Sequence, residues 1–375
     1  DVSHYVSPDS ALERAALKRG TATYLGETIL PLLPAQLTNQ IGALLPGQDR
    51  LTLSLLLTLN AAGDVLEFEI QPSVIQVDYQ LTYPQVEAIL QRAAGLPEDL
   101  QELAPVFEQI DQLQALAVAL KQQRHQHGGF ELSLSAPRFH HFDDEGLLGV
   151  MVASPDWQAR LIVEEFMVLA NQKVATHLKA LGVPAIYRIQ PIPDLYNVQE
   201  LIKLANNLSL ELSLAQEDSV QPQDYQNFVE KFATSETAPI LNQLLVSTLK
   251  PGSYSLTSGP HFGLILAQDY AHFTSPLRRY ADVLNQRVLQ AVFAKGRDRR
   301  TTRAKEKVNL HHSSCHGQIT WNVLPPEIQR DLEASLTATV HQLNEREKIT
   351  QQAEQDLEGL QKAKQMQART GEIFR

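Results

Sequence analysis

The sequence predicts a single large α+β domain in which a mixed β-sheet is surrounded by helices. Three observations support this prediction. The chain of 375 residues can bury a large core, helical and strand periodicities are interspersed along it, and no repeat, linker or low-complexity segment divides it. We therefore place the domain at residues 1–369. Residues 370–375 have the pattern of a strand and are interpreted as the start of a further domain.

The first part of the chain is predicted to begin with a helix and to continue as strands. Ser10 and Glu13 have the spacing of a capping box, and Gly20 provides a C-terminal stop, so residues 11–19 should form a helix. Residues typical of strands, bounded by turn residues, follow. The predicted strands cover 51–60, 65–70 and 73–81, with the first two joined as a hairpin.

The rest of the chain is predicted to mix helices and short strands. Helical segments are predicted at 84–95, 110–123, 156–181 and 278–294. Further strands are predicted at 130–135, 146–153, 183–188, 253–256 and 261–266. Pro326 suits the first turn of a last helix, whose apolar residues lie on one side and which extends to about residue 369.

The composition excludes several classes of protein. No run of eighteen apolar residues is present, so no membrane span is expected. The single cysteine, Cys315, rules out an internal disulfide and favours a reducing, cytoplasmic setting. The formal net charge of −11 argues against a generally basic surface, although a phosphate path needs only a local groove of lysine and arginine. Residues 1–6 show no signal peptide and read like a strand, which suggests a chain that has been cut.

The densest chemical stretch is His272–Asp282, with the sequence HFTSPLRRYAD. Thr274 and Ser275 are good helix caps, and two arginines follow inside the predicted first turn. A helix N-terminus attracts anions, so arginines placed there favour a phosphate site. The alternative is an ordinary capped helix whose arginines pair with Asp269 and Asp282.

The segment His272–Asp282 closely resembles the signature segment of the RNB-domain exoribonucleases, the family of RNase II and RNase R. Further segments resemble the family in the correct order: 1–6, 12–15, 19–25, 30–34, 162–171, 187–188 and 260–264. The resemblance covers nearly the whole chain. It implies a single RNB-type catalytic domain with a narrow channel, and processive 3′→5′ hydrolysis of single-stranded RNA to nucleoside 5′-monophosphates.

The resemblance implies roles for four residues along the channel. Tyr24 and Phe130 stand where the family places two aromatic clamps, and base stacking holds a strand without reading its sequence. Tyr83 resembles the tyrosine that packs on the terminal base and sets the final product length. Glu164 matches a carboxylate that contacts the ribose of the terminal nucleotides, which favours RNA over DNA. Core packing is the alternative for each aromatic, and a solvated helix face is the alternative for Glu164.

At the catalytic end of the channel, Arg278 matches the arginine near the scissile phosphate, where a fixed cation stabilises charge in the transition state. Glu354 aligns with a glutamate near the end of the family's domain that affects turnover. An apparent insertion at 296–325 lies between the signature segment and Glu354. The neighbouring residues expected to contact RNA are Thr274, Ser275, Arg279 and Tyr280.

The metal site is the main departure from the family. RNB enzymes hold magnesium with four aspartates, which lie just upstream of the strand whose end aligns with Asp1. Such a cluster does not occur in the printed sequence. We therefore expect Mg²⁺ in a full-length, monomeric protein and no activity from residues 1–375 alone. A non-catalytic RNA-binding or regulatory RNB-fold protein is the alternative. By the same resemblance, residues 370–375 would begin an S1-type RNA-binding domain.

Three further clusters of charged or metal-ligating residue types occur in the sequence. The acidic run 143–145 matches no family motif and is not expected to replace the missing aspartates. The basic segment 295–307 is interpreted as a solvated loop or a local phosphate contact. Residues His311–His316 include types that ligate zinc, but their spacing fits no standard finger, so an insertion loop near the RNA entrance is favoured.

Overall fold

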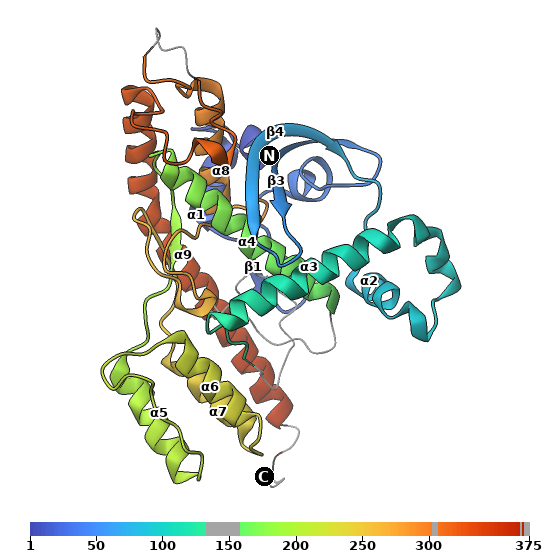
Figure 1. The fold of residues 1–375 in the computed structure, drawn as a ribbon, viewed down its shortest axis with the longest axis vertical. Helices are drawn as coiled ribbons and strands as arrows, with labels where there is room; N and C mark the ends of the chain where they lie inside the picture. The colour runs from blue at the N-terminus through green and yellow to red at the C-terminus, as the bar shows by residue number, and fades with distance from the viewer. Residues whose placement is uncertain (133–157, 302–306, 368–369, 371–375) are drawn as a thin grey trace.

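The computed structural model describes residues 1–132, 158–301, 307–367 and 370 (Figure 1). Helices and strands are mixed along the chain, which confirms the α+β class. Within the described residues the strands form three separate two-stranded antiparallel sheets, so the expected single mixed sheet is not found there. The paired strands are β1 (Thr23–Leu25) with β2 (Thr28–Leu30), β3 (Asp49–Leu59) with β4 (Val65–Gln76), and β5 (Tyr187–Ile189) with β6 (Ser253–Ser255).

Helices make up most of the described chain. The α-helices are α1 (Ala11–Arg19), α2 (Tyr83–Leu90), α3 (Phe107–Gln126), α4 (Gln158–Ala180), α5 (Leu195–Asn207), α6 (Pro222–Phe232), α7 (Ala238–Thr248), α8 (Tyr280–Lys295) and α9 (Pro326–Gln367). Short 3₁₀ or π turns are η1 (Val2–His4), η2 (Leu37–Ile41), η3 (Arg92–Ala94), η4 (Glu98–Val106), η5 (Phe262–Leu264) and η6 (Ser313–Cys315). No helix in the described ranges is long and apolar enough to cross a bilayer.

Helix α1 confirms the prediction from the capping residues. The Ser10 side chain accepts a hydrogen bond from the Glu13 amide, and Gly20 ends the helix with a φ of 73°. A side chain at Gly20 would also collide with α9, because a Cβ atom there would lie 2.8 Å from the Cβ of Arg346. Glycine therefore both ends α1 and allows α9 to pack closely against it.

The β3–β4 hairpin is confirmed, but its second strand is longer than predicted. The Oδ1 atom of Asn60 accepts hydrogen bonds from the amides of Ala62 and Asp64, which shapes the turn. Strand β4 continues through Pro72, so no separate strand begins at residue 73. The amide of Ile70 points away from β3 toward a carbonyl of another segment, and Pro72, two residues later, faces the same way. The proline therefore removes no hydrogen bond from the hairpin.

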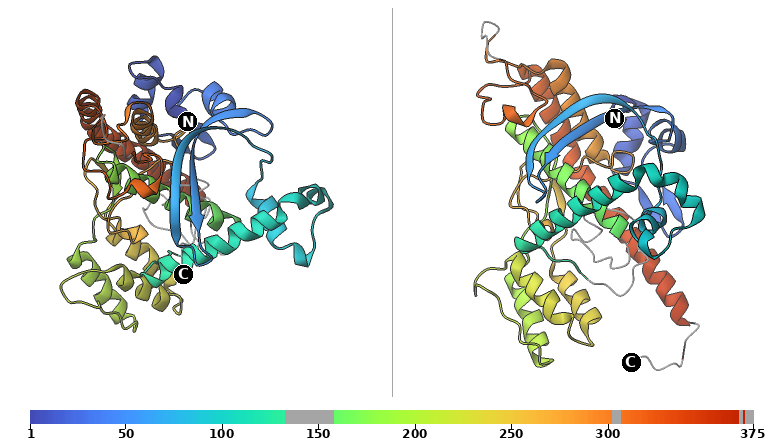
Figure 2. Two further views of the ribbon diagram at one scale, coloured as in Figure 1. Left: turned by 45° about the horizontal axis from the view of Figure 1, so that its top comes forward. Right: turned by 45° about the vertical axis from the view of Figure 1, so that its right-hand side comes forward.

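Two large hydrophobic cores and one small cluster, formed by Val168, Leu264 and Tyr270, organise the described chain. The larger core joins α1, β3–β4, the C-terminal half of α4, α8 and α9. The second core joins α5, α6 and α7 with Phe130 and Phe262. Figure 2 shows α4 (green) passing close to β3–β4 and α9, while α5–α7 form a separate group at one end. Helix α4 contributes its C-terminal half to the large core and Val168 to the small cluster.

Several predicted elements are placed differently by the structure. Residues 261–266 form the turn η5 closed by an isolated bridge between His261 and Leu266, and not a strand. Residues 130–132 form no strand element, and the rest of that predicted strand, together with 146–153, lies outside the described residues. The strand predicted at 183–188 is limited to β5.

Candidate functional site

The signature segment 272–282 is held on one side by α4. The buried side chain of Asn171 accepts hydrogen bonds from the amides of Phe273 (2.9 Å) and Thr274 (3.2 Å), and its Nδ2 donates to the hydroxyl of Tyr270 (3.1 Å). Asn171 follows Glu164 by seven residues, so the two side chains lie on the same face of α4. One helix face therefore fixes the signature segment and presents a carboxylate beside it.

On the other side the segment is fixed by Asp282. Its carboxylate accepts two hydrogen bonds from the guanidinium of Arg279 (2.9 and 3.0 Å) and one from the amide of Ser275 (2.7 Å). This pairing is one of the alternatives that the sequence left open. The other proposed partner, Asp269, pairs instead with Lys179 at 2.7 Å.

The expected helix start at residue 278 is wrong, and so is the prediction that Thr274 and Ser275 cap it. Arg279 is extended, with φ −126° and ψ 125°, and α8 begins at Tyr280. The reason is tertiary: Arg279 forms an isolated bridge with Thr21 and an ion pair with Asp282. Both contacts hold the backbone out of the helical conformation.

Arg278 lies in the turn before α8 and is partly exposed. Its carbonyl accepts hydrogen bonds from the amide of Ala22 (2.8 Å) and the hydroxyl of Thr21 (3.1 Å), which fix its backbone. Its guanidinium donates to the Ser275 hydroxyl at 3.2 Å. The buried Oγ1 of Thr274 makes no hydrogen bond. The turn therefore presents a cation and polar groups from a rigid backbone.

Three of the predicted site residues come together with a fourth that the sequence analysis missed. Burial and the charge of Glu164 raise the pKa of Tyr83, while the charges of Arg160 and Arg278 oppose this shift. Arg160 also forms an ion pair with Glu164 along α4. We call Tyr83, Arg160, Glu164 and Arg278 the Tyr83–Arg278 group. The four-residue spacing of Arg160 and Glu164 on a predicted helix was the signal that could have identified Arg160.

The carboxyl of Glu164 is largely buried, and burial raises its pKa against the opposing charge of Arg160. The next residue, Glu165, faces a different neighbour and pairs with Arg124 of α3 at 2.7 Å. Arg124 also pairs with Glu131 at 2.9 Å. This buried network fixes α4, which carries Glu164, against α3.

Tyr24 and Glu354 lie next to each other, on the strand that follows the contact between Thr21 and Arg278 and on α9. The amide of Tyr24 donates to Oε1 of Glu354 at 2.7 Å, which joins β1 to α9. The hydroxyls of Thr23 and Thr350 also lie 3.3 Å apart. Because Thr21 contacts Arg278 and β1 begins two residues later, this strand links the clamp position to the signature segment. Glu354 supports that strand.

Three other predicted RNA contacts have internal partners. Phe130 is 2% exposed and packs against the rings of Tyr225 and Phe262, with centroids 5.2 and 6.0 Å away. Tyr280 is also 2% exposed, and its hydroxyl donates to Glu13 at 2.8 Å. Arg279 is engaged by Asp282, as described above. Core packing, the alternative stated for Phe130, is what the structure shows, and contact of these three side chains with RNA stays a prediction.

The described residues around Arg278 do not suit magnesium. This ion prefers several oxygen ligands. In the described part of the chain, the carboxylate of Glu164 is paired with Arg160 and that of Asp282 with Arg279. The acidic run 143–145 lies outside the described residues. We therefore assign no magnesium ligand and no metal-dependent step to these residues.

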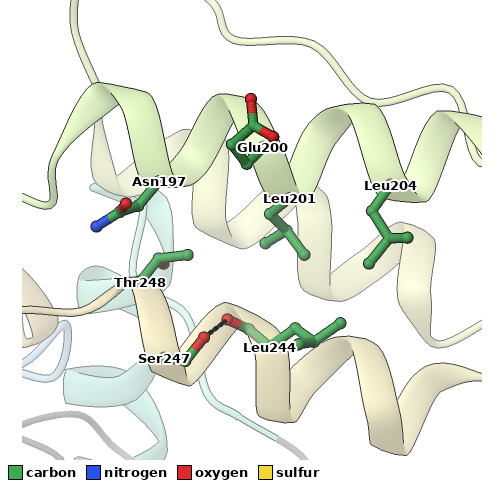
Figure 3. A pocket seen from close by; sticks show the side chains of 7 residues that line it. All are labelled: Asn197, Glu200, Leu201, Leu204, Leu244, Ser247 and Thr248. Atoms are coloured by element: carbon green, nitrogen blue, oxygen red, sulfur yellow. Dashed lines mark hydrogen bonds between the residues drawn. The ribbon is translucent and has the colours of Figure 1, made fainter.

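Two hollows lie elsewhere on the described surface. Figure 3 shows the first, of about 350 Å³ between α5 and α7; it is lined by Asn197, Glu200, Leu201, Leu204, Leu244, Ser247 and Thr248. Its carboxylate, Glu200, pairs with Lys203 at 2.7 Å, and none of the predicted site residues lines it. The second, of about 430 Å³, lies between the β3–β4 turn, α3, α4 and residues 264–266 and includes Arg124 and Glu165. Neither hollow is lined by Tyr83, Glu164 or Arg278.

Comparison with known proteins gives one family. The RNB domain matches residues 1–295. The acetazolamide conferring resistance protein zam of Synechocystis is 39% identical over 377 residues, covering 100% of this chain and 47% of that protein. Ribonuclease R of Vibrio parahaemolyticus is 33% identical over 313 residues, covering 84% of this chain and 37% of that protein. The chain thus spans half or less of the length of these curated relatives.

Solved structures show the same fold. Apo Mycoplasma genitalium RNase R has a TM-score of 0.74 at 22% identity, covering 95% of this chain and 51% of that one. Structures of the same enzyme with ribose methylated single-stranded RNA and with double-stranded RNA have TM-scores of 0.74 and 0.75 at 23% identity. Yeast Ssd1, a pseudonuclease, has a TM-score of 0.67 at 20% identity, covering 95% of this chain and 39% of that one. The fold is therefore shared by a nuclease and a pseudonuclease.

Proposed function

The chain belongs to the RNB family, and from this we propose that the whole protein is a 3′→5′ exoribonuclease that degrades single-stranded RNA processively to nucleoside 5′-monophosphates. The observation that carries the proposal is the Tyr83–Arg278 group. It combines an aromatic ring, a carboxyl and a guanidinium, which suit the base, the ribose hydroxyls and the phosphate of one nucleotide. The RNA-bound structures of Mycoplasma genitalium RNase R support RNA as the ligand.

Each residue of the group has a separate task in this proposal. Tyr83 stacks on the terminal base, which grips any of the four bases. Glu164 contacts the 2′-hydroxyl, which separates RNA from DNA. Arg278 stabilises the charge that develops on the phosphate as the bond to the departing nucleotide breaks. Arg160 holds the carboxyl of Glu164 in place.

Magnesium remains part of the proposal for the whole protein only. When bound, it would supply an activated water and neutralise the leaving oxygen. Its ligands would be carboxylates other than those of Glu164 and Asp282, because these two carboxylates are paired with arginines. A monomeric state and a cytoplasmic setting likewise remain predictions.

A second candidate is a non-catalytic RNA-binding protein. One observation favours it: the fold is shared with a pseudonuclease. In that case the Tyr83–Arg278 group would bind an RNA 3′ end without cleaving it.

One experiment separates the two candidates. The whole protein and residues 1–375 are each incubated with magnesium and 5′-labelled oligo(A), with oligo(dA) and a 3′-phosphorylated oligo(A) as matched controls. We expect the whole protein to shorten oligo(A) from its 3′ end and to spare oligo(dA). Binding of oligo(A) without any shortening by the whole protein would instead establish the RNA-binding candidate. Failure to bind either oligonucleotide at low salt would contradict both candidates.

A further inference from the structure

Three side chains whose residue types ligate transition metals meet near the C-terminal end of α4. The Tyr83–Arg278 group lies near the other end of this helix. His177 comes from the end of α4, Cys315 ends η6, and His316 follows it. Their possible ligand atoms all lie within 4.8 Å of one another. His177 and Cys315 are fully buried, while His316 is partly exposed. The cluster therefore joins two segments that are more than a hundred residues apart in sequence.

The segment that carries Cys315 and His316 is fixed to the edge of β4. The amide of Ile70 donates to the carbonyl of His311 at 2.8 Å, and the Nδ1 of His311 lies 3.0 Å from the carbonyl of Ile70. The amide of Phe68 donates to the hydroxyl of Ser313 at 3.0 Å. Figure 2 shows η6 (orange) close to both α4 (green) and the blue hairpin. These contacts set the position of Cys315 and His316 independently of any bound ion.

The imidazole of His177 is oriented as metal ligands usually are. Its Nε2 lies 2.9 Å from the carbonyl of Leu310, and only a protonated Nε2 makes that contact a hydrogen bond. Its Nδ1 then carries a lone pair, which faces Nε2 of His316 at 2.9 Å. Ligating histidines commonly donate their second ring N–H to a backbone carbonyl, which fixes the tautomer and the ring.

We propose that His177, Cys315 and His316 bind a zinc ion through Nδ1 of His177, Sγ of Cys315 and Nε2 of His316. Water completes the tetrahedron on the side where His316 is exposed. Binding releases the thiol proton of Cys315 to solvent, and the thiolate then bonds to the ion. The proton that Nε2 of His316 donates to His177 in the metal-free chain is lost to solvent while Nδ1 of His316 takes one up, so Nε2 is free to bind the ion. Soft thiolate and imidazole ligands select zinc over magnesium, so this site is chemically separate from any magnesium site of the nuclease.

The distance between the two imidazole nitrogens needs only a small adjustment, and Sγ of Cys315, within 4.8 Å of them, would have to move closer to the ion. Zinc–nitrogen bonds of about 2.0–2.1 Å in a tetrahedron separate the two nitrogens by roughly 3.3 Å. The nitrogens of His177 and His316 lie 2.9 Å apart, so the rings would move apart by roughly 0.4 Å. His316 follows the short turn η6 and can make this movement, whereas His177 is fixed within α4.

The protonation states of the imidazoles agree with the geometry. Burial lowers the pKa of His177 to about 4, and burial together with the charge of His312 also lowers the pKa of His316. Both rings are therefore neutral at neutral pH, as metal binding requires. Burial raises the pKa of Cys315, so the thiol keeps its proton until a metal displaces it.

Zinc at this place would tie α4, β4 and the 309–318 segment together. The ring of Phe68 on β4 lies edge-on to both imidazoles, with centroids 5.7 and 5.6 Å away, and shields the ion on that side. Because α4 also carries Glu164 and Asn171, the ion would stabilise the helix that positions the Tyr83–Arg278 group. We therefore expect the ion to stabilise this part of the fold.

The test measures metal content and ligand identity in the reduced 375-residue chain. We expect one zinc per chain after purification. Cobalt(II) exchanged into the site should give the visible bands of a tetrahedral centre and a thiolate-to-cobalt charge-transfer band. Cys315→Ser should remove the charge-transfer band, and His316→Gln should lower the affinity for the ion by at least roughly 10–100-fold.

The control is His312→Gln, three residues from Cys315. His312 bonds to Ser314 and lies 3.6 Å from Glu67, so this variant changes a histidine of the same segment outside the cluster. It should keep full zinc content and both cobalt signals. Circular dichroism checks that each variant is folded. Absence of bound zinc and cobalt in the folded, reduced wild-type chain would overturn the proposal and leave His177 and His316 as a hydrogen-bonded pair. An undiminished charge-transfer band in Cys315→Ser would overturn it too.

Discussion

Helix α4 supports two unlike groups of side chains. Glu164 and His177 are thirteen residues apart, which corresponds to about 20 Å along the helix axis. At Glu164 the group is charged and partly exposed, and its residues come from α2, α4 and the turn before α8. At His177 the group is uncharged and almost fully buried. The same helix can thus hold polar chemistry at the surface and a compact, neutral cluster in the core.

The difference between the two groups shows what each kind of signal can predict. Three of the four residues of the first group, Tyr83, Glu164 and Arg278, are predicted from family motifs, which preserve chemistry at fixed places along the chain. The second group combines a residue of α4 with two residues of the segment that looked like an insertion. The spacing within His311–His316 does not predict a zinc site, because one of the three possible ligands, His177, comes from another element.

The largest expected effect is on chemistry at the first group. In the whole protein, Arg278→Ala should lower kcat for oligo(A) by about 10²–10³-fold while changing the affinity for RNA much less, because its contribution is concentrated in the transition state. Arg278→Lys should recover little, since an ammonium cannot reproduce the planar guanidinium. Single-turnover rates and equilibrium binding on the same RNA separate the two quantities. Equal losses of rate and affinity would make Arg278 a simple phosphate anchor.

The second group should contribute to the dependence of stability on pH. In the metal-free chain the pKa of His177 falls from 6.5 in the unfolded state to about 4 in the folded state. Between these values the unfolded chain binds the additional proton, so the free energy of unfolding falls as the pH is lowered from 6.5 to 4. The expected loss is about 3 kcal/mol, added to the losses from other groups.

Urea denaturation at several pH values measures this slope. His177→Asn should be less stable at neutral pH but should lose less stability between pH 6.5 and 4, because no buried imidazole remains to be protonated at that position. His312→Gln, in which His177 is intact, should change the slope much less, because the charge of His312 is the smallest of the named causes that lower the pKa of His177. A slope unchanged by His177→Asn would place the titration on other groups.

A smaller effect is expected for the residue that connects α4 to the signature segment. Asn171→Ala leaves the buried amide of Phe273 without its acceptor and should destabilise the chain by about 1–3 kcal/mol. The site should also lose its alignment, so kcat should fall further than the loss of folded protein explains. Asn206→Ala removes an amide side chain that accepts from the Leu212 amide in the α5 region. This matched control should destabilise the chain without changing the kcat of the protein that remains folded.

Much of the fold could be predicted because its signals are local. The capping residues of α1, the turn of the β3–β4 hairpin and the apolar stripe of α9 each act within a few residues, and all three elements are confirmed. The start of α8 could not be predicted, since Thr21 and Asp282 together hold Arg279 extended. Residues 261–266 were predicted as a strand from their composition, but in the structure they fold back on themselves.

The same limit applies to the site. Tyr83, Glu164 and Arg278 could be proposed singly from family motifs, and the structure brings them together. Asn171 could not be predicted because its partner, the Phe273 amide, is supplied only by the fold, whereas the four-residue spacing of Arg160 and Glu164 was available in the sequence. Phe130 illustrates a different limit, since the family position predicts contact with RNA while the structure also gives the ring internal partners, Tyr225 and Phe262.

The smallest effect on rate, and the most specific, is expected at Tyr83. A processive enzyme stops when the remaining RNA is too short to be held by both the clamp and the catalytic end. Tyr83→Ala in the whole protein should remove roughly 1–3 kcal/mol of stacking on the terminal base. A long RNA keeps its other contacts, so its initial rate of degradation should change little. A remnant of a few nucleotides has no such contacts and should dissociate before the next cleavage, which leaves a longer final product.

Resolving the end products of oligo(A) on a sequencing gel tests this expectation. Tyr79→Ala is the matched control, because Tyr79 is an exposed tyrosine four residues earlier in the chain and outside the Tyr83–Arg278 group. It should leave both the rate and the product length unchanged. The half-buried position of Tyr83 at the start of α2 suits packing as well as stacking on a base. A product length that is the same in Tyr83→Ala and in the wild type would therefore assign Tyr83 to packing, and the group at Glu164 and Arg278 would hold the phosphate and ribose without gripping the base.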